Sequence, residues 1–348
     1  MKIEDLQSFL QQPQEGLLHF GEDLLWRFHL AVSSHPFVLL AGLPGSGKTA
    51  LALGYARYLT SDYESKGYCS MHIRPEWNNS QALMGSYDSQ RQEYLSTAFL
   101  DMVLRALRNP DRHYFVILDG VDLARPEHYL SDYLNAMGSE QAVRLHPIER
   151  CIAKAGVNRE EANLVCHDLC VNCFFSCPSA LPSRLPSMMS KFVPPMIHFP
   201  KNFVVIGTLL QENWQDALST STLDRAHLIT LDEHSVASYL EGPAKGMVGP
   251  RTHSFICALE VLLASYNQGI GYRVVRQCMN FVEKGEKEGM KELELLDRYV
   301  EQRFLPRLRA NLKDNAEAMK QLAELLESEG LDKSTKRFNN LVQTIQKP

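Results

Sequence analysis

The segment Gly42–Thr49 reads GLPGSGKT and places glycines, a lysine and a threonine in the spacing G-x4-G-K-T. Glycines let a loop wrap a phosphate chain so that backbone N–H groups point at its oxygens. The lysine adds charge for the β- and γ-phosphates, and the threonine hydroxyl can hold Mg²⁺. An apolar run precedes the segment and a helical run follows it, as such a loop requires. The sequence therefore predicts a phosphate-binding loop that consists of Gly42, Leu43, Pro44, Gly45, Ser46, Gly47, Lys48 and Thr49.

A carboxylate is needed beside Thr49 to complete a Mg²⁺ site. Asp119 ends HYFVILD, the most strand-like run in the chain. An aspartate at the end of a buried strand holds Mg²⁺ in nucleotide-hydrolysing proteins with this loop. We expect Thr49 and Asp119 to share that role.

Four of the eight cysteines crowd into one short segment. Cys166, Cys170, Cys173 and Cys177 have the spacing C-x3-C-x2-C-x3-C. Four thiolates so arranged can close a tetrahedral zinc site, which would staple a segment poor in apolar residues. Reduced free thiols and an iron–sulfur cluster are the alternatives.

The elements that must position these residues alternate along the chain. Apolar runs typical of buried strands are separated by amphipathic runs, which predicts an α/β fold with a parallel sheet and helices on both faces. The strand runs are residues 36–42, 68–75, 113–120, 202–210 and 227–232. The helical runs between them include residues 20–33, 48–61 and 97–108.

Two stretches depart from this alternation. Residues 140–200 are rich in proline, serine and cysteine, which indicates an insertion. After about residue 250 only helical runs follow, which predicts a small helical domain. We expect one domain over residues 1–245, with the insertion inside it, and a second over residues 246–348.

Composition narrows the class of protein. The 348 residues are 45% hydrophobic and 22% charged, as in ordinary globular proteins. The formal net charge of −5 gives no overall basic excess, so direct contact with DNA stays an open question. No apolar stretch is long enough for a membrane span, and acidic residues stand near the start where a signal peptide is basic. A cytoplasmic protein is expected.

Beyond these local patterns, the chain resembles a known family, the McrB-like AAA+ motors of modification-dependent restriction systems. The strongest match is Arg74–Met137. In that family a tryptophan and a leucine-glycine pair precede a hairpin, and a helix resembling ARPEHYLSDYL, which follows the Asp119 strand here, comes after the equivalent strand. FPKNFVVIGTLL, STLDRAHLITL, GIGYRVVRQ and RFLPRLRANL resemble further segments of that family. The resemblance implies an AAA+ P-loop NTPase fold with a small C-terminal helical lid. It also implies a ring, expected to be a hexamer, with nucleotide between subunits.

Single residues carry over on these motifs. Arg225 in LDRA matches the arginine finger that reaches a neighbouring subunit's γ-phosphate, and Arg273 matches the lid arginine that contacts nucleotide. Pairing with Asp224 or with a helix end is the alternative for Arg225. A plain arginine at a helix N-terminus is the alternative for Arg273. Arg125 and Glu127 match the loop that follows the Asp119 strand.

Three departures from the family weaken the expectation of hydrolysis. Gly120 replaces the glutamate that orients and deprotonates water, Asp122 replaces an asparagine, and Leu210 replaces the asparagine of the sensor-1 strand. Asp122 is a candidate substitute base. We therefore expect nucleotide binding to survive and hydrolysis by this chain alone to be slow.

The leading hypothesis is a nucleotide-dependent motor or switch that acts with a partner effector, such as a nuclease, in defence against foreign DNA. The alternative is a scaffold that binds nucleotide, barely hydrolyses it and uses occupancy to hold an assembly. A small-molecule kinase is disfavoured by the helical lid and by the LDRA segment. ATP with Mg²⁺ is the expected ligand, and GTP is the alternative because some McrB-like motors use it.

Overall fold

The computed structural model describes residues 2–12, 15, 18–63, 66–88, 90, 93–139, 141–145, 193–194, 196–210, 218–231, 236–266, 269–306 and 315–345. The chain divides into two compact units. The sheet unit comprises Asp23–Gly42 and Thr49–Thr230. The helical unit comprises Met1–Glu22, Leu43–Lys48 and Leu231–Pro348.

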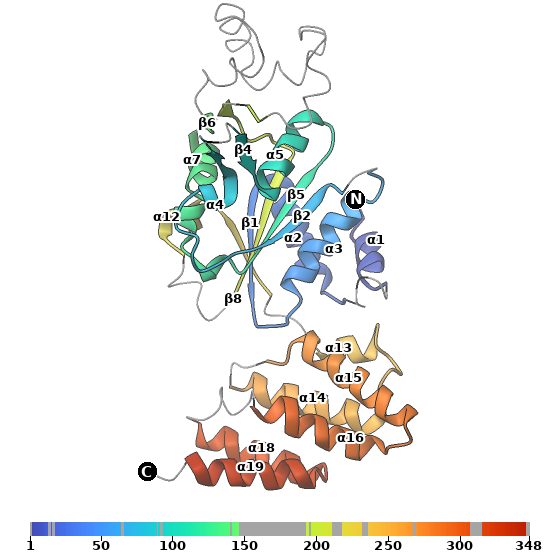
Figure 1. Ribbon diagram of the computed structural model, residues 1–348. Helices are drawn as coiled ribbons and strands as arrows, with labels where there is room; N and C mark the ends of the chain where they lie inside the picture. The colour runs from blue at the N-terminus through green and yellow to red at the C-terminus, as the bar shows by residue number, and fades with distance from the viewer. Residues whose placement is uncertain are drawn as a thin grey trace, which may run out of the picture. The chain divides into compact units, whose positions relative to one another are not determined.

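The sheet unit is built on five parallel strands (Figure 1). Across the sheet they are β2 (Tyr68–His72), β5 (Tyr114–Asp119), β8 (Phe203–Leu210), β1 (Phe37–Gly42) and β9 (His227–Thr230). Because every strand runs the same way, their carboxyl ends meet at one edge. The predicted α/β fold, a parallel sheet with flanking helices and a C-terminal helical part, is confirmed.

The strands are continuous apolar runs because helices cover both faces of the sheet. Every residue of β1 is buried. On one face lie α2 (Glu22–Ser34) and α3 (Lys48–Leu59). Phe28 of α2 packs edge-on against Tyr55 of α3 at 4.9 Å between ring centres, and Tyr55 packs against Phe115 of β5 at 6.0 Å. These ring contacts give α3 a fixed place on the sheet.

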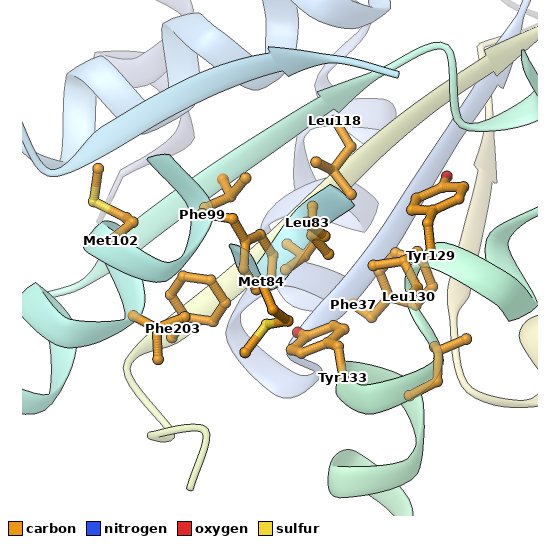
Figure 2. Packing of buried hydrophobic residues seen from close by; sticks show 14 of the residues in the cluster. Phe37, Leu83, Met84, Phe99, Met102, Leu118, Tyr129, Leu130, Tyr133 and Phe203 are labelled. Carbon is orange, nitrogen blue, oxygen red and sulfur yellow. The ribbon is translucent and has the colours of Figure 1, made fainter. Parts of the chain in front are cut away.

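The other face carries the larger core (Figure 2). It is covered by α4 (Gln81–Met84), α5 (Ala98–Arg108), α6 (Pro126–Tyr129) and α7 (Ser131–Ser139). Phe99 of α5 lies edge-on to Phe203 and Tyr133 at 5.3 and 5.9 Å. The residues labelled in Figure 2 are Phe37, Leu83, Met84, Phe99, Met102, Leu118, Tyr129, Leu130, Tyr133 and Phe203.

The sheet unit also contains two short antiparallel pairs of strands. The hairpin β3 (Gly85–Asp88) and β4 (Glu93–Ser96) precedes α5. β6 (Val143–Arg144) pairs with β7 (Met196–Ile197), which joins the two flanks of the predicted insertion. The insertion's four cysteines lie outside the described residues, so the predicted zinc site stays a prediction.

The helical unit begins with α1 (Ile3–Leu10) and contains most of the C-terminal third of the chain. The C-terminal elements are α13 (Val236–Glu241), α14 (Pro250–Ala264), α15 (Tyr272–Lys287), α16 (Glu292–Tyr299), the π-helical turn η5 (Val300–Phe304), α18 (Ala316–Ser328) and α19 (Asp332–Ile345).

A buried carboxylate fixes the start of one of these helices. Asp297 accepts hydrogen bonds from the backbone N–H groups of Lys333 and Ser334 at 2.9 and 2.8 Å, which satisfies the first turn of α19.

None of the described helices is long and apolar enough to cross a membrane. The domain boundary expected at residue 245 stays a prediction.

Candidate functional site

The predicted phosphate loop connects β1 to α3 and has the backbone that such a loop needs. Gly45 and Gly47 have φ values of +84° and +98°, in the left-handed region that side chains disfavour. Space is also short, since a Cβ on Gly47 would lie 3.1 Å from the Phe20 ring. Both glycines are therefore required by conformation.

The polar groups of this loop fit a phosphate ligand. Lys48 is buried, and its ammonium donates to the Leu43 carbonyl at 2.8 Å, so the charge is held within the loop. Ser46 is fully buried, and its hydroxyl oxygen has no hydrogen-bond partner among the described residues. A buried hydroxyl without a partner is costly, and a phosphate oxygen could supply one.

At the carboxyl edge of the sheet, Asp119 gathers three side chains from three other elements. Its Oδ1 accepts hydrogen bonds from the hydroxyls of Thr49 and Thr208, both at 2.7 Å. Its Oδ2 lies 3.0 Å from Nδ1 of His72. We call these four residues the Asp119 cluster. The predicted meeting of Thr49 with Asp119 is thus present in the geometry, and their role in binding Mg²⁺ stays a prediction.

The environment keeps Asp119 ionised. Burial by itself raises the pKa of this carboxyl, but the hydrogen bonds from Thr49 and Thr208 and the neighbouring His72 lower it by more. The net result is a pKa below its ordinary value. An anionic carboxylate beside a threonine hydroxyl is the oxygen donor set that Mg²⁺ prefers.

Sequence reasoning missed Thr208 and His72, and strand register explains why they matter. Asp119 pairs with His72 on β2 and with Thr208 on β8. All three therefore lie side by side across neighbouring strands. A usable signal existed: each is a polar residue at or near the end of an apolar run.

Gly120 lacks a side chain and also adopts a backbone conformation that side chains disfavour. Its φ and ψ are +77° and +52°, the left-handed region. A Cβ placed there would lie 2.8 Å from the tip of Leu123. The backbone N–H of Gly120 donates to the Thr208 carbonyl at 3.1 Å, which ties this turn to β8. A glutamate at this position would carry backbone strain.

The structure places Asp122 and Leu210 together. Asp122 lies on η2 (Val121–Leu123), and its carboxylate accepts from the backbone N–H of Leu210 at 3.4 Å. Leu210 is partly exposed at the end of β8 and offers only an apolar side chain there. The proposed role of Asp122 as a base stays a prediction.

Arg225 follows α12 (Thr220–Asp224) and folds back on it. Its guanidinium donates to the backbone carbonyl of Ser221 at 2.9 Å and also to the Ser221 hydroxyl. The guanidinium is therefore held against α12 in this structure, and the role of Arg225 as an arginine finger stays a prediction. A role as an arginine finger requires it to leave this contact.

Arg273 lies within the helical unit, beside the phosphate loop. Its backbone N–H approaches the Gly45 carbonyl at 3.4 Å, and its side chain is exposed. The preceding Gly271 is packed so tightly that a Cβ would lie 2.6 Å from the Pro44 carbonyl. Tyr272 donates from its hydroxyl to the His19 carbonyl at 2.9 Å. The predicted lid arginine thus starts a helix that packs on the loop.

Comparisons with known proteins add little to this picture. A family described as a domain of unknown function (DUF8727) matches residues 237–347, within the helical unit. No curated protein sequence matches the chain. The crystal structure of Cdc6p from Pyrobaculum aerophilum is similar with 14% identity and a TM-score of 0.42, covering 85% of this chain and 65% of that one. At that TM-score the similarity carries no argument about function.

Proposed function

We propose that this chain binds a nucleoside triphosphate with Mg²⁺ through the loop Gly42–Thr49 and the Asp119 cluster. One observation carries the proposal: Thr49, the residue that follows the loop's lysine, donates to Asp119 at 2.7 Å. Two sequence motifs 70 residues apart, each expected to hold Mg²⁺, are thereby joined at one edge of the sheet. ATP is the proposed nucleotide, and competition by GTP distinguishes the alternative.

Each residue of this site has a defined task in the proposal. Backbone N–H groups of the loop bind the phosphates, Lys48 neutralises their charge, and Thr49 and Asp119 hold Mg²⁺. The bound Mg²⁺–nucleotide supplies the transferable phosphoryl group and a divalent charge. Thr208 and His72 keep the Asp119 carboxylate ionised and in place. Arg273, on the helix that packs against the loop, contacts the nucleotide.

Hydrolysis by the isolated chain is proposed to be slow. Gly120 has no group that can take a proton from water, and Leu210 has none that can orient it. A positioned general base contributes about 10²–10⁴ in rate. This feature favours the second candidate function, a nucleotide-dependent scaffold, over a motor that turns over quickly.

The wider role rests on the resemblance to McrB-like AAA+ motors. We infer a ring in which Arg225 acts on the nucleotide of a neighbouring copy, together with a separate effector such as a nuclease, in defence against foreign DNA. The Arg225 guanidinium donates to Ser221 in the contacts described, and these hydrogen bonds are exposed, so the guanidinium can exchange partners.

A binding titration tests the nucleotide site. Lys48→Ala is expected to weaken a fluorescent ATP analogue at least tenfold, or about 1.4 kcal/mol. Lys201→Ala, at an exposed lysine outside the loop, is the matched control and should bind as wild type does. Equal affinity of wild type and Lys48→Ala would overturn the assignment.

A turnover assay separates motor from scaffold. Wild-type turnover below about 1 s⁻¹, the low end of ordinary enzymes, is expected. Gly120→Glu should raise it at least tenfold, whereas Gly120→Gln carries the same backbone strain without a carboxylate and should not. Fast wild-type turnover without a partner would show that Gly120 is no handicap.

Mass photometry with a non-hydrolysable ATP analogue tests the ring. Wild type should assemble when the analogue is present, and Arg225→Ala should assemble less while binding it equally well. Arg251→Ala, at an exposed arginine of α14, is the control. A wild type that stays monomeric with every nucleotide would remove the ring from the proposal.

A further inference from the structure

Beyond the Asp119 strand, the sheet unit contains a cavity that the nucleotide site proposed above does not include, although its lining contains Asp122, the candidate base. It has a volume of about 290 Å³ and opens between the loop after β5 and the start of α12. Its polar lining comes from Asp122, Arg125, Glu127 and Ser219, and its apolar lining from Leu123, Ala124 and Leu218.

One carboxylate in the lining lacks a hydrogen-bond partner among the described residues. The Oε2 atom of Glu127 is buried and has no hydrogen-bond partner among the described residues. Arg125, two residues away, forms no ion pair with it in the part of the chain that the structure describes. A buried carboxylate oxygen without a donor is costly, because it loses its hydration and gains nothing in return. The missing partner is a hydrogen-bond donor, and the charge of the group favours a cation.

The apolar part of the lining narrows the class of cation. Leu218 is buried in the wall, whereas Leu123 is 54% exposed. A long basic side chain combines an aliphatic stem with a charged, hydrogen-bonding head. Its stem can cover Leu123 while its head reaches Glu127 and Asp122. A hydrated metal ion would leave the exposed leucine uncovered.

The position of the cavity indicates where such a side chain would come from. Ser219 caps α12, the helix that ends beside Arg225, and Asp122 lies in the loop that follows Asp119. The ring proposed above places Arg225 at a boundary between copies. Ser219 and Arg225 stand at the two ends of this short helix, so the cavity lies near the boundary that the proposed ring requires.

We propose that this cavity receives a lysine or arginine side chain from a second copy of this chain, with Glu127 as its main partner. The inference rests on the proposed ring and adds a specific contact to it. A basic segment of an unrelated protein is the competing occupant.

Mass photometry with a non-hydrolysable ATP analogue, over a range of protein concentration, tests this contact. Glu127→Gln keeps the shape of the side chain and removes its charge. It should raise the concentration for half-assembly at least tenfold and leave binding of the analogue unchanged. Glu286→Gln, at an exposed glutamate of α15, is the matched control and should assemble as wild type does.

A competition experiment on wild-type protein tests the contact without relying on the folding of a variant. Arginine amide at tens of millimolar should dissociate wild-type assemblies more than NaCl of equal ionic strength does. Assemblies of Glu127→Gln should dissociate equally in the two salts. If wild type assembles but Glu127→Gln assembles equally well, or arginine amide acts no differently from NaCl, the contact is wrong and the ring stands. If wild type binds nucleotide yet never assembles, the ring fails and this contact fails with it.

Discussion

The Asp119 cluster and the cavity lined by Glu127 lie close in sequence, but their carboxylates differ in how many hydrogen-bond partners they have. Asp119 has partners on both oxygens, supplied by Thr49, Thr208 and His72. Glu127 has an oxygen that is buried and has no partner among the described residues. A satisfied network fixes its members in place, whereas an unsatisfied group needs a partner from outside. The contrast indicates one site organised within the chain and another completed by a second molecule.

Asp119→Asn is expected to have the largest effect on the site that is organised within the chain. Loss of the charge should reduce the gain in nucleotide affinity that Mg²⁺ provides by at least tenfold, about 1.4 kcal/mol, because Asn is a poor ligand for a hard cation. Fluorescence titration with Mg²⁺ and with EDTA measures the gain. Glu127→Gln should keep the full Mg²⁺ effect, and a similar loss in both variants would erase the distinction between the two sites.

Thr208→Val tests the same cluster through its effect on stability, because it keeps the shape of the side chain and removes the hydroxyl that donates to Asp119. The hydroxyl donates to an ionised carboxylate, and such a bond contributes about 1.5 kcal/mol or more to the free energy of unfolding. Chemical denaturation should show this loss. Thr230→Val on β9 is the matched control, since no bond to a carboxylate is described for it. Equal stability of both variants would mean that the Asp119 cluster is not a strong network.

Gly120→Ala tests the turn that follows the cluster. A side chain in the left-handed region costs about 1 kcal/mol, and the added Cβ must also displace the tip of Leu123. Gly120→Asn should cost less, because asparagine tolerates this conformation. Thermal unfolding measures both. If Ala and Asn are equally harmless, the turn relaxes easily and the strain assigned to Gly120→Glu does not exist.

The smallest effect is expected from His72→Gln. The side chain of His72 is 80% exposed, so water screens its interaction with Asp119. We expect a change in unfolding free energy below about 0.5 kcal/mol. A loss as large as that of Thr208→Val would show that both oxygens of Asp119 are held equally firmly.

The order of elements was predictable because it is written in local patterns. Apolar runs such as residues 113–120 and 202–210 become β5 and β8, and the helical spacing of residues 97–108 becomes α5. The phosphate loop was predictable for the same reason, since its glycines, lysine and threonine are neighbours in the chain. The residue at which α19 begins was not predictable, because its first turn is satisfied by Asp297, 36 positions before Lys333.

The sequence alone thus determined the loop Gly42–Thr49, the strand that ends at Asp119 and the helical C-terminal part. The tertiary structure decided which side chains reach Asp119, that Gly120 is left-handed and that Glu127 lacks a partner. These depend on register between strands far apart in the chain and on how closely loops pack. Local periodicity encodes neither, because it specifies which face of an element is buried and not which residue of another element lies opposite.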